Sequence, residues 1–114
     1  MKKIEAIIRK SRQDIVQESL WKRGFTGMTV TEVIGSGSTR RNDYLAEVEQ
    51  KGYRIDLRPK VKLEIFCNDE DAETIIGIIM SNACTNSVGD GRIFVLNVEE
   101  AIRIRTGERG ESIL

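Results

Sequence analysis

The stretch that decides the fold is NDEDAETIIGIIMSNACTNSVGDGRIFVLNV, residues 68–98. Its first half has the pattern of an amphipathic helix. Asn68 can cap the N-terminus, and the acidic residues at positions 69–71 suit the positive end of the helix dipole. The apolar stripe consists of Ala72, Ile75, Ile76, Ile79, Met80 and Ala83. Ile93–Val98 then forms an apolar run, so the stretch predicts a helix that leads the chain into a strand.

Three segments earlier in the chain have the apolar alternation that is typical of β-strands. They are residues 3–9, 28–33 and 61–65, and the second is rich in β-branched side chains. Between the first two lies the pattern of another helix, with an N-terminal signal, an apolar face and a stop. The residues that carry it are Ser11 and Asp14 at the start, Ile15, Val16 and Leu20 on the apolar face, and Gly24 at the end.

The element order is therefore βαββαβ, which belongs to the α+β class. It predicts a ferredoxin-like sandwich, in which a four-stranded antiparallel sheet carries two helices on one face. The last strand is nevertheless apolar on both sides, with Ile93 and Val95 on one and Phe94, Leu96 and Val98 on the other. We therefore expect copies of the chain to cover the second face, which predicts a closed homo-oligomer. Alternatively, the C-terminal segment folds back over it.

Length and composition limit the class of function. The chain has 114 residues with 18 basic and 18 acidic side chains, so we expect one domain, residues 1–114, without a global attraction for nucleic acid or anionic membranes. No apolar run approaches the ~18 residues of a membrane span, and the N-terminus lacks a signal-peptide pattern. This predicts a cytoplasmic protein without membrane insertion. Cys67 and Cys84 stand without any histidine, which argues against a zinc site and a serine triad.

Three segments carry residues that suit an anion. Gly35-Ser36-Gly37 lets the backbone leave a strand close to a ligand, and Gly89-Asp90-Gly91-Arg92 can present successive N–H groups as an anion nest. Arg103-Ile104-Arg105-Thr106-Gly107 places two guanidinium groups on one side of an extended segment, while Ile102 and Ile104 anchor the other. Each segment alone is compatible with a bend, a turn or a charged edge strand. Their conjunction favours a phosphate site.

No nucleophile–base pair accompanies these segments, so a binding site is favoured over an active site, and no metal is expected. An RNA-recognition domain has the same element order but stacks bases on aromatic side chains of the sheet. The first strand has none and the third has only Phe66, so nucleic acid is not an expected partner. A small acyl-phosphate or phosphate-ester hydrolase is an alternative from a different class.

One connection is longer than a minimal domain needs. Residues 38–58 mix basic and acidic side chains between two predicted strands. Loops of this length are usually functional or disordered, so we interpret the segment as an exposed excursion that binds a partner. An elongated hairpin without a particular role is the alternative. At the other end of the chain, residues 108–114 are expected to form a flexible tail.

Several segments occur together in an order that is characteristic of one family. They are MKKIEAIIR, GMTVTEVIGSG, VKLEI, VGDGRIFVLNV and AIRIRTGE, with Tyr53, Asp56, Pro59 and Lys60 at matching spacing. In these segments the chain resembles the PII signal-transduction proteins, small nucleotide-binding regulators of nitrogen and carbon metabolism. The resemblance implies a homotrimer that binds ATP or ADP between neighbouring subunits. It also implies that the long loop, called the T-loop, docks on a transporter, a metabolic enzyme or a regulator.

The resemblance implies roles for individual residues. The phosphates are expected at Gly89, Asp90, Gly91 and Arg92, called the B-loop, and at Arg103 and Arg105 of the C-terminal loop. The adenosine is expected at Thr29, Glu64 and Phe66, with Gly35, Gly37 and Ser38 closing over it. Lys60 matches the lysine that lies near 2-oxoglutarate in the family. The expected ligands are ATP, ADP or AMP, and no further cofactor is required.

The sequence departs from the family in both loops. Ser38 and Thr39 replace an arginine and a glutamine that helps to bind Mg²⁺ and 2-oxoglutarate, which predicts a weakened response to that effector. Asn86 and Ser87 replace a glycine and a lysine. Loss of the lysine removes a charge-assisted contact worth ~1.5–3 kcal/mol, and this favours ADP or AMP over ATP. Tyr53 falls where many relatives carry a modified tyrosine, but the surrounding loop differs.

Together these observations predict a PII-like regulator that is not an enzyme. It would bind adenine nucleotide between subunits and control a partner protein in nitrogen or carbon metabolism through its exposed loop. The alternative within the same fold is a diverged PII-like protein that regulates the transport of bicarbonate or another solute and responds to ADP or AMP.

Overall fold

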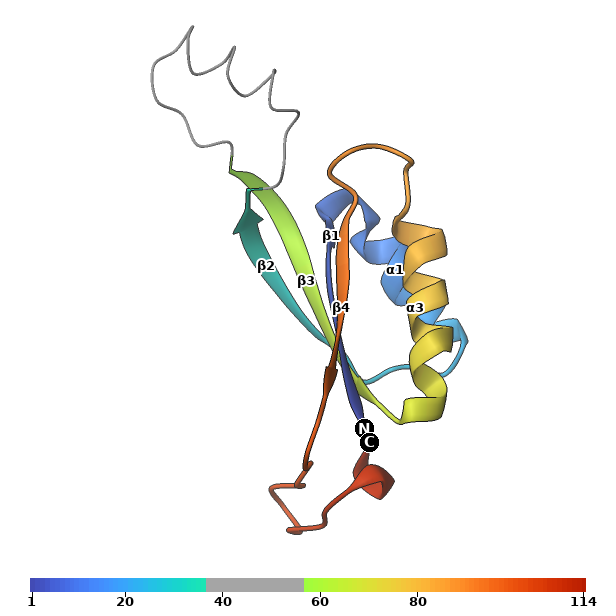
Figure 1. The fold of residues 1–114 in the computed structure, drawn as a ribbon, viewed down its shortest axis with the longest axis vertical. Coiled ribbons are helices and arrows are strands. Elements are labelled where there is room, and N and C mark those ends of the chain that lie inside the picture. Colours follow the sequence, from blue (N-terminus) through green and yellow to red (C-terminus); the bar gives the residue numbers. More distant parts are fainter. Residues whose placement is uncertain (37–56) are drawn as a thin grey trace, which may run out of the picture.

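The computed structural model describes residues 1–36 and 57–114. Its helices and strands follow the predicted βαββαβ order (Figure 1). In chain order they are β1 (Lys2–Arg9), α1 (Gln13–Lys22), β2 (Thr29–Gly35), β3 (Arg58–Cys67), α3 (Asp69–Ala83) and β4 (Gly91–Asn97). Short 3₁₀ turns at Lys10–Arg12 and Glu111–Ile113 complete the described secondary structure.

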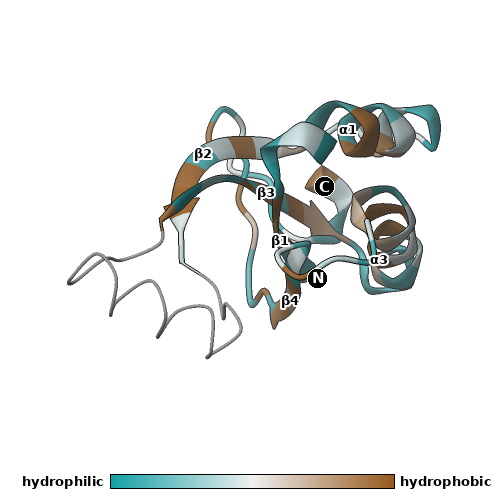
Figure 2. Cartoon of the chain, turned by 90° about the horizontal axis from the view of Figure 1, so that it is seen from above, coloured by the Kyte–Doolittle hydropathy of each residue, from teal (hydrophilic) through white to brown (hydrophobic). Residues whose placement is uncertain are grey.

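The four strands form one antiparallel sheet in the order β2-β3-β1-β4. In the register, Ala6 of β1 lies between Leu63 of β3 and Ile93 of β4. Ile4, Ala6 and Ile8 alternate along β1 and are buried, because this face of the sheet is covered by both helices (Figure 2). The predicted fold class, a ferredoxin-like sandwich with both helices on one face, is confirmed.

The core lies between this face of the sheet and the two helices. Its buried residues come from β1, α1, β3 and α3, and all are apolar or cysteine. They are Ile4, Ala6, Ile8, Val16, Leu20, Val61, Leu63, Ile65, Cys67, Ala72, Ile75, Ile78, Ile79 and Ala83. Burial of apolar surface at about 25 cal/mol per Å² is what holds these layers together.

The helix ends and the face of the second helix differ in detail from the prediction. Helix α1 has Arg12 at its N-cap instead of Ser11, because the chain leaves β1 through a 3₁₀ turn. Helix α3 has the predicted Asn68 at its N-cap, although no side-chain hydrogen bond caps it. Its buried face includes Ile78, whereas Met80 is 59% exposed. The buried face of α3 is rotated relative to the predicted stripe because α3 packs against α1 as well as against the sheet.

The second face of the sheet is open in the single chain. On β4, Phe94 is 49% exposed and Leu96 is 45% exposed. The C-terminal segment forms a small hairpin, closed by a hydrogen bond of 2.9 Å from the Gly110 N–H to the Ala101 carbonyl. This hairpin lies beyond the end of the sheet, near the N-terminus (Figure 1). The hairpin therefore does not cover the open face. The alternative interpretation, in which the C-terminal segment folds back over this face, is wrong for the single chain.

The predicted excursion at residues 38–58 falls almost entirely outside the described residues, since β2 ends at Gly35 and β3 begins at Arg58. In the C-terminal tail, Glu111–Ile113 form a 3₁₀ turn, and the Glu111 carboxylate lies 3.8 Å from the N-terminal ammonium group. The flexibility expected of this tail is a matter of dynamics and stays a prediction. Among the helices of the described residues, none combines the length and apolar character needed to cross a membrane.

Candidate functional site: the loop between α3 and β4

Two glycines give the loop between α3 and β4 its shape. Gly89 has a φ of +101° and Gly91 a φ of +102°, the left-handed region that favours glycine. At Gly91 a Cβ atom would lie only 1.7 Å from the Ile7 carbonyl oxygen, because the backbone of β4 approaches β1 closely there. No side chain fits at this position. The backbone path therefore accounts for both glycines of the Gly-Asp-Gly sequence.

Asp90, between the two glycines, holds the loop together. Its carboxylate accepts hydrogen bonds from the Thr85 backbone N–H at 2.7 Å, from the Thr85 hydroxyl group, and from Arg9 Nε at 3.0 Å. The Thr85 hydrogen bonds, with that from Arg9, hold the pKa of the Asp90 carboxyl well below its usual range. The structure thus gives Asp90 a role within the loop, and direct contact of Asp90 with a nucleotide stays a prediction.

Two cations from the sheet bind successive carbonyl groups of this loop. Arg9 Nη2 donates to the Val88 carbonyl at 2.8 Å, and Lys60 Nζ donates to the Gly89 carbonyl at 2.5 Å. In a trans peptide the C=O and N–H bonds point in opposite directions. The N–H groups of Gly89 and Asp90 therefore point away from the cations, and neither donates to another atom of residues 1–36 and 57–114. Adjacent N–H groups of this kind form an anion nest.

Lys60 also contacts the end of β2. A Cβ atom at Gly35 would lie 3.5 Å from Lys60 Cγ, and Arg9 is the direct partner of Lys60 across the β1–β3 ladder. Burial lowers the pKa of Lys60, and the nearby charges of Arg9 and Arg58 lower it further. A cationic cluster thus lies beneath the loop, beside the strand end from which the long excursion starts.

The sequence prediction missed Arg9. Its partner Asp90 lies 81 residues further along the chain, so no local spacing connects the two. A basic residue at the end of a strand is also common on solvated surfaces. Only the pairing of β1 with β4, which places Ile8 opposite Gly91, reveals the contact.

The residues predicted to lie near the adenosine share the open face of the sheet. Thr29 of β2 lies directly opposite Glu64 of β3, and Phe66 projects from the same side two residues later. Glu64 forms ion pairs with Lys62 at 3.2 Å and Lys3 at 3.8 Å. The Lys3 ammonium group also lies 6.0 Å from the centre of the Phe66 ring. The structure therefore brings all three predicted residues together.

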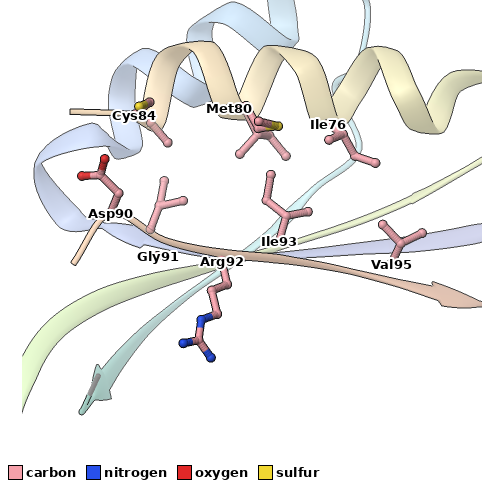
Figure 3. A pocket seen from close by; sticks show the side chains of 11 residues that line it. Ile76, Met80, Cys84, Asp90, Gly91, Arg92, Ile93 and Val95 are labelled. Carbon is pink, nitrogen blue, oxygen red and sulfur yellow. The ribbon is translucent and has the colours of Figure 1, made fainter. Parts of the chain in front are cut away.

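Arg92 also belongs to the open face. It lies opposite Ile7 in the register, and its side chain points to the side of β4 away from α3 (Figure 3). On the other side, between α3 and β4, is a groove of about 430 Å³ with a mainly apolar lining that includes Ile76, Met80 and Ile93 (Figure 3). Asp90, Gly91 and Arg92 also border this groove, but its mainly apolar lining suits an anion poorly.

The C-terminal arginines do not reach this loop within one chain. The predicted extended segment is in fact a turn, in which the Gly107 N–H donates to the Arg103 carbonyl at 2.8 Å. Gly107 permits the reversal with a φ of +73°. Ile104 lies in this turn and is fully exposed, so it anchors nothing among the described residues, and Arg103 is paired with Glu108 at 3.1 Å. The turn and the loop after α3 lie at opposite ends of β4 (Figure 1).

Four predicted residues cannot be placed. Gly37, Ser38, Thr39 and Tyr53 lie outside the described residues. Gly35, at the end of β2, lies at the same end of the sheet as the nest, because Lys60 contacts both. The structure thus brings Gly35, Lys60 and Gly89 together, and leaves the two C-terminal arginines apart from them.

Comparison with known proteins shows the family. A family model described as Nitrogen regulatory protein P-II matches residues 1–108. The nitrogen regulatory protein P-II of Pasteurella multocida (strain Pm70) is 49% identical over 114 residues, which is 100% of both chains. Nitrogen regulatory protein P-II 2 of Methanothermobacter thermautotrophicus (strain Delta H) is 47% identical over 111 residues, 97% of this chain and 95% of that relative.

A solved structure is similar as well. The crystal structure of Arabidopsis thaliana PII bound to citrate aligns with a TM-score of 0.76 at 39% identity, covering 97% of this chain and 86% of that chain. Fold and matches together define a signal-transduction regulator of the ferredoxin-like class. The chain belongs to the nitrogen regulatory protein P-II family.

Proposed function

We propose that this protein is a cytoplasmic, trimeric regulator that binds an adenine nucleotide and thereby changes its affinity for a protein partner. The observation that carries the proposal is the pair of N–H groups at Gly89 and Asp90, which two cations turn outward as an anion nest. A nucleotide phosphate is a ligand that such a nest suits. Backbone N–H groups bind a phosphate without any change in their own protonation.

The nucleotide site is completed by a second copy of the chain. Arg103 and Arg105 lie at the opposite end of β4 from the nest, so one protomer cannot bring both to the same phosphate group (Figure 1). A ring of copies related by rotation can bring the C-terminal turn of one protomer to the nest of the next. The exposed apolar side chains of Phe94, Leu96 and Ile104 support such an assembly, because contact between copies would bury them.

The adenosine is bound on the open face of the sheet. Thr29, Glu64 and Phe66 lie together there, and Phe66 is half exposed and offers its ring for stacking. Gly35, with Gly37 and Ser38, closes over the nucleotide. The excursion at residues 38–58 follows Gly35, which ends β2 beside the nest, so nucleotide binding biases the conformation of the excursion and thereby its affinity for a transporter, enzyme or regulator.

A carboxylate effector is the second ligand of this region. Lys60 and Arg9 form a local concentration of positive charge, and Arg58 lies close enough to lower the pKa of Lys60. The solved Arabidopsis thaliana relative is bound to citrate, a carboxylate. Because Thr39 replaces the family glutamine, the response to 2-oxoglutarate is weaker than in typical members. The second candidate function is regulation of the transport of bicarbonate or another solute, in response to ADP or AMP.

Binding without turnover distinguishes the regulator from a small hydrolase. The relatives are named as regulatory proteins. We expect ATP and acetyl phosphate to stay intact when incubated with the protein at stoichiometric concentration. Steady release of inorganic phosphate would favour the hydrolase.

The assigned phosphate role of the C-terminal turn is tested by Arg105→Ala. Removal of one charge-assisted phosphate contact should weaken ADP binding by more than about tenfold, as measured by calorimetric titration. The matched control is Arg109→Ala, which removes an arginine from the same hairpin that pairs with Glu100 at 3.6 Å. Both variants should keep the oligomeric state of the wild type in sedimentation experiments. Unchanged ADP affinity in Arg105→Ala would contradict the assignment.

A further inference from the structure

We infer that Arg9 and Lys60 are positioning residues for the proposed phosphate site. They hold the carbonyl groups of Val88 and Gly89, and so orient the N–H groups of Gly89 and Asp90 toward the anion. The inference rests on the proposed function and adds a role for two side chains that act through the backbone. It concerns the ligand-free protein, in which the cations already hold the loop.

The geometry favours a single arrangement of these peptides. Arg9 and Lys60 are direct neighbours across the β1–β3 ladder, so both side chains project from the same face of the sheet. The two carbonyl groups that they hold are successive, and both are drawn toward this side. Because each peptide unit is planar and trans, the two N–H groups that belong to these units both turn to the other side.

Without the cations this orientation has little else to maintain it. Gly89 has positive φ and no side chain, so the peptide groups on either side of it can rotate at small steric cost. The carboxylate of Asp90 accepts hydrogen bonds from Thr85, Arg9 and the Ser87 backbone, and as an acceptor it cannot hold the two carbonyl groups. Loss of the Lys60 ammonium group therefore frees the Gly89–Asp90 peptide to turn its carbonyl group toward the ligand.

Arg9 performs two functions at this point. Its Nε bonds the Asp90 carboxylate at 3.0 Å, and its Nη2 bonds the Val88 carbonyl at 2.8 Å. A Cβ atom at Gly89 would lie 3.2 Å from Arg9 Nη2, so the loop lies close over the guanidinium group. Lys60 makes one contact with the loop in the described residues, from its ammonium group to the Gly89 carbonyl. It is therefore the cleaner residue to change.

The test compares Lys60→Met with the conservative Lys60→Arg, which keeps a donor. Lys10→Met is the matched control. Lys10 follows β1 directly, and its ion pair with Glu32 at 3.1 Å is exposed. Two readouts are needed: the backbone amide NMR signals of Gly89 and Asp90 in the ligand-free protein, and the affinity for ADP by calorimetry. Far-UV circular dichroism and sedimentation would confirm that each variant has the fold and oligomeric state of the wild type.

We expect Lys60→Met to shift the Asp90 amide signal before any ligand is added and to weaken ADP binding by about tenfold or more. Lys60→Arg should recover most of both effects, and Lys10→Met should change neither. Weaker binding without a change in the ligand-free amide signals would mean that Lys60 contacts the ligand directly, and this would overturn the inference. So would an unchanged affinity.

The proposed function fails separately from this inference. If the wild-type protein binds neither ADP, ATP nor AMP, the proposed function is wrong whatever the variants do. The amide signal of Asp90 in ligand-free Lys60→Met still decides whether Lys60 orients the loop. If that signal matches the wild type, the positioning role is wrong even in a protein that binds nucleotide.

Discussion

At the scale of single residues, the loop after α3 contains positions that the backbone conformation fixes and a position where the change from the family pattern alters the charge. Gly91 is fixed by the approach of β4 to β1, since a Cβ atom would lie 1.7 Å from the Ile7 carbonyl oxygen. Asn86 has a φ of +61°, and asparagine tolerates this left-handed conformation better than most residues other than glycine. Its replacement of the family glycine therefore keeps the backbone path. Ser87, in contrast, changes the charge of the loop.

Ser87→Lys should restore the missing cation. A lysine at this position adds a charge-assisted contact to the phosphate site, worth ~1.5–3 kcal/mol, or about tenfold to a hundredfold in affinity. We expect the affinity for ATP to rise more than that for ADP, because ATP carries the additional phosphate. Titration of both nucleotides into wild type and variant checks this. An equal rise for both, or no rise, would contradict the explanation of the departure.

Gly91→Ala should destabilise the protein by about 2 kcal/mol or more, because the new methyl group meets the backbone of β1 and the residue has a strained φ. The matched control is Gly77→Ala in α3, where an added Cβ atom has no neighbour within 4 Å among the described residues beyond its own helical turn. Higher helix propensity should stabilise that variant by about 0.5–1 kcal/mol. Urea denaturation measures both. Equal stability of the two variants would contradict the close approach of β4 to β1 at Gly91.

Asp90 should stabilise the fold throughout the neutral range. Thr85 and Arg9 hold the pKa of its carboxyl below the usual range in the folded protein, so the unfolded chain binds a proton first as the pH falls. The contribution is therefore fully present above the unfolded pKa, about 3.9, and is lost progressively below it. Asp90→Asn should lower the Tm at pH 7, and its difference from the wild-type Tm should shrink as the pH falls below the unfolded pKa and disappear only below the folded pKa. A pH-independent difference would contradict this linkage.

At the scale of the elements, the strands and the second helix could be predicted because their patterns are local. Alternation along β1 and β3 and the caps and stripe of α3 each depend on neighbouring residues. Features set by tertiary packing could not be read in this way. The burial of Ile78 in place of Met80 depends on α1. The turn at Arg103–Gly107 is local, and Gly107 at positive φ is the signal that could have predicted it. Arg9 entered the site only through the pairing of distant strands.

The revised face of α3 predicts different effects for neighbouring positions. Ile79 is 1% exposed, so Ile79→Ala should lower the free energy of unfolding by about 2–5 kcal/mol through lost burial and a cavity. Met80 is mostly exposed in the groove beside β4, and Met80→Ala should change it by less than about 1 kcal/mol. Chemical denaturation of the two variants checks this. A larger loss for Met80→Ala would mean that the groove is filled in the assembled protein.

At the scale of the whole molecule, the single chain has only part of the proposed phosphate site and leaves an apolar face of its sheet exposed. The nest at Gly89 and the arginines of the C-terminal turn lie at opposite ends of β4, and the open face carries exposed Phe94 and Leu96. Membership of the P-II family is established by matches over nearly the whole chain. The central proposal, a nucleotide site built by two copies, explains both incomplete features with one arrangement.

Mixing two defective variants tests this proposal most directly. Arg92→Ala damages the loop side of the proposed site and Arg105→Ala damages the turn side. After the variants are unfolded and refolded together in equal amounts, ADP binding is measured at a concentration that saturates the wild type but neither variant alone. Random assembly should recover about a quarter of the wild-type sites, each built from two chains whose contributing sides are intact. Binding no greater than that of the separate variants would contradict a site shared between copies.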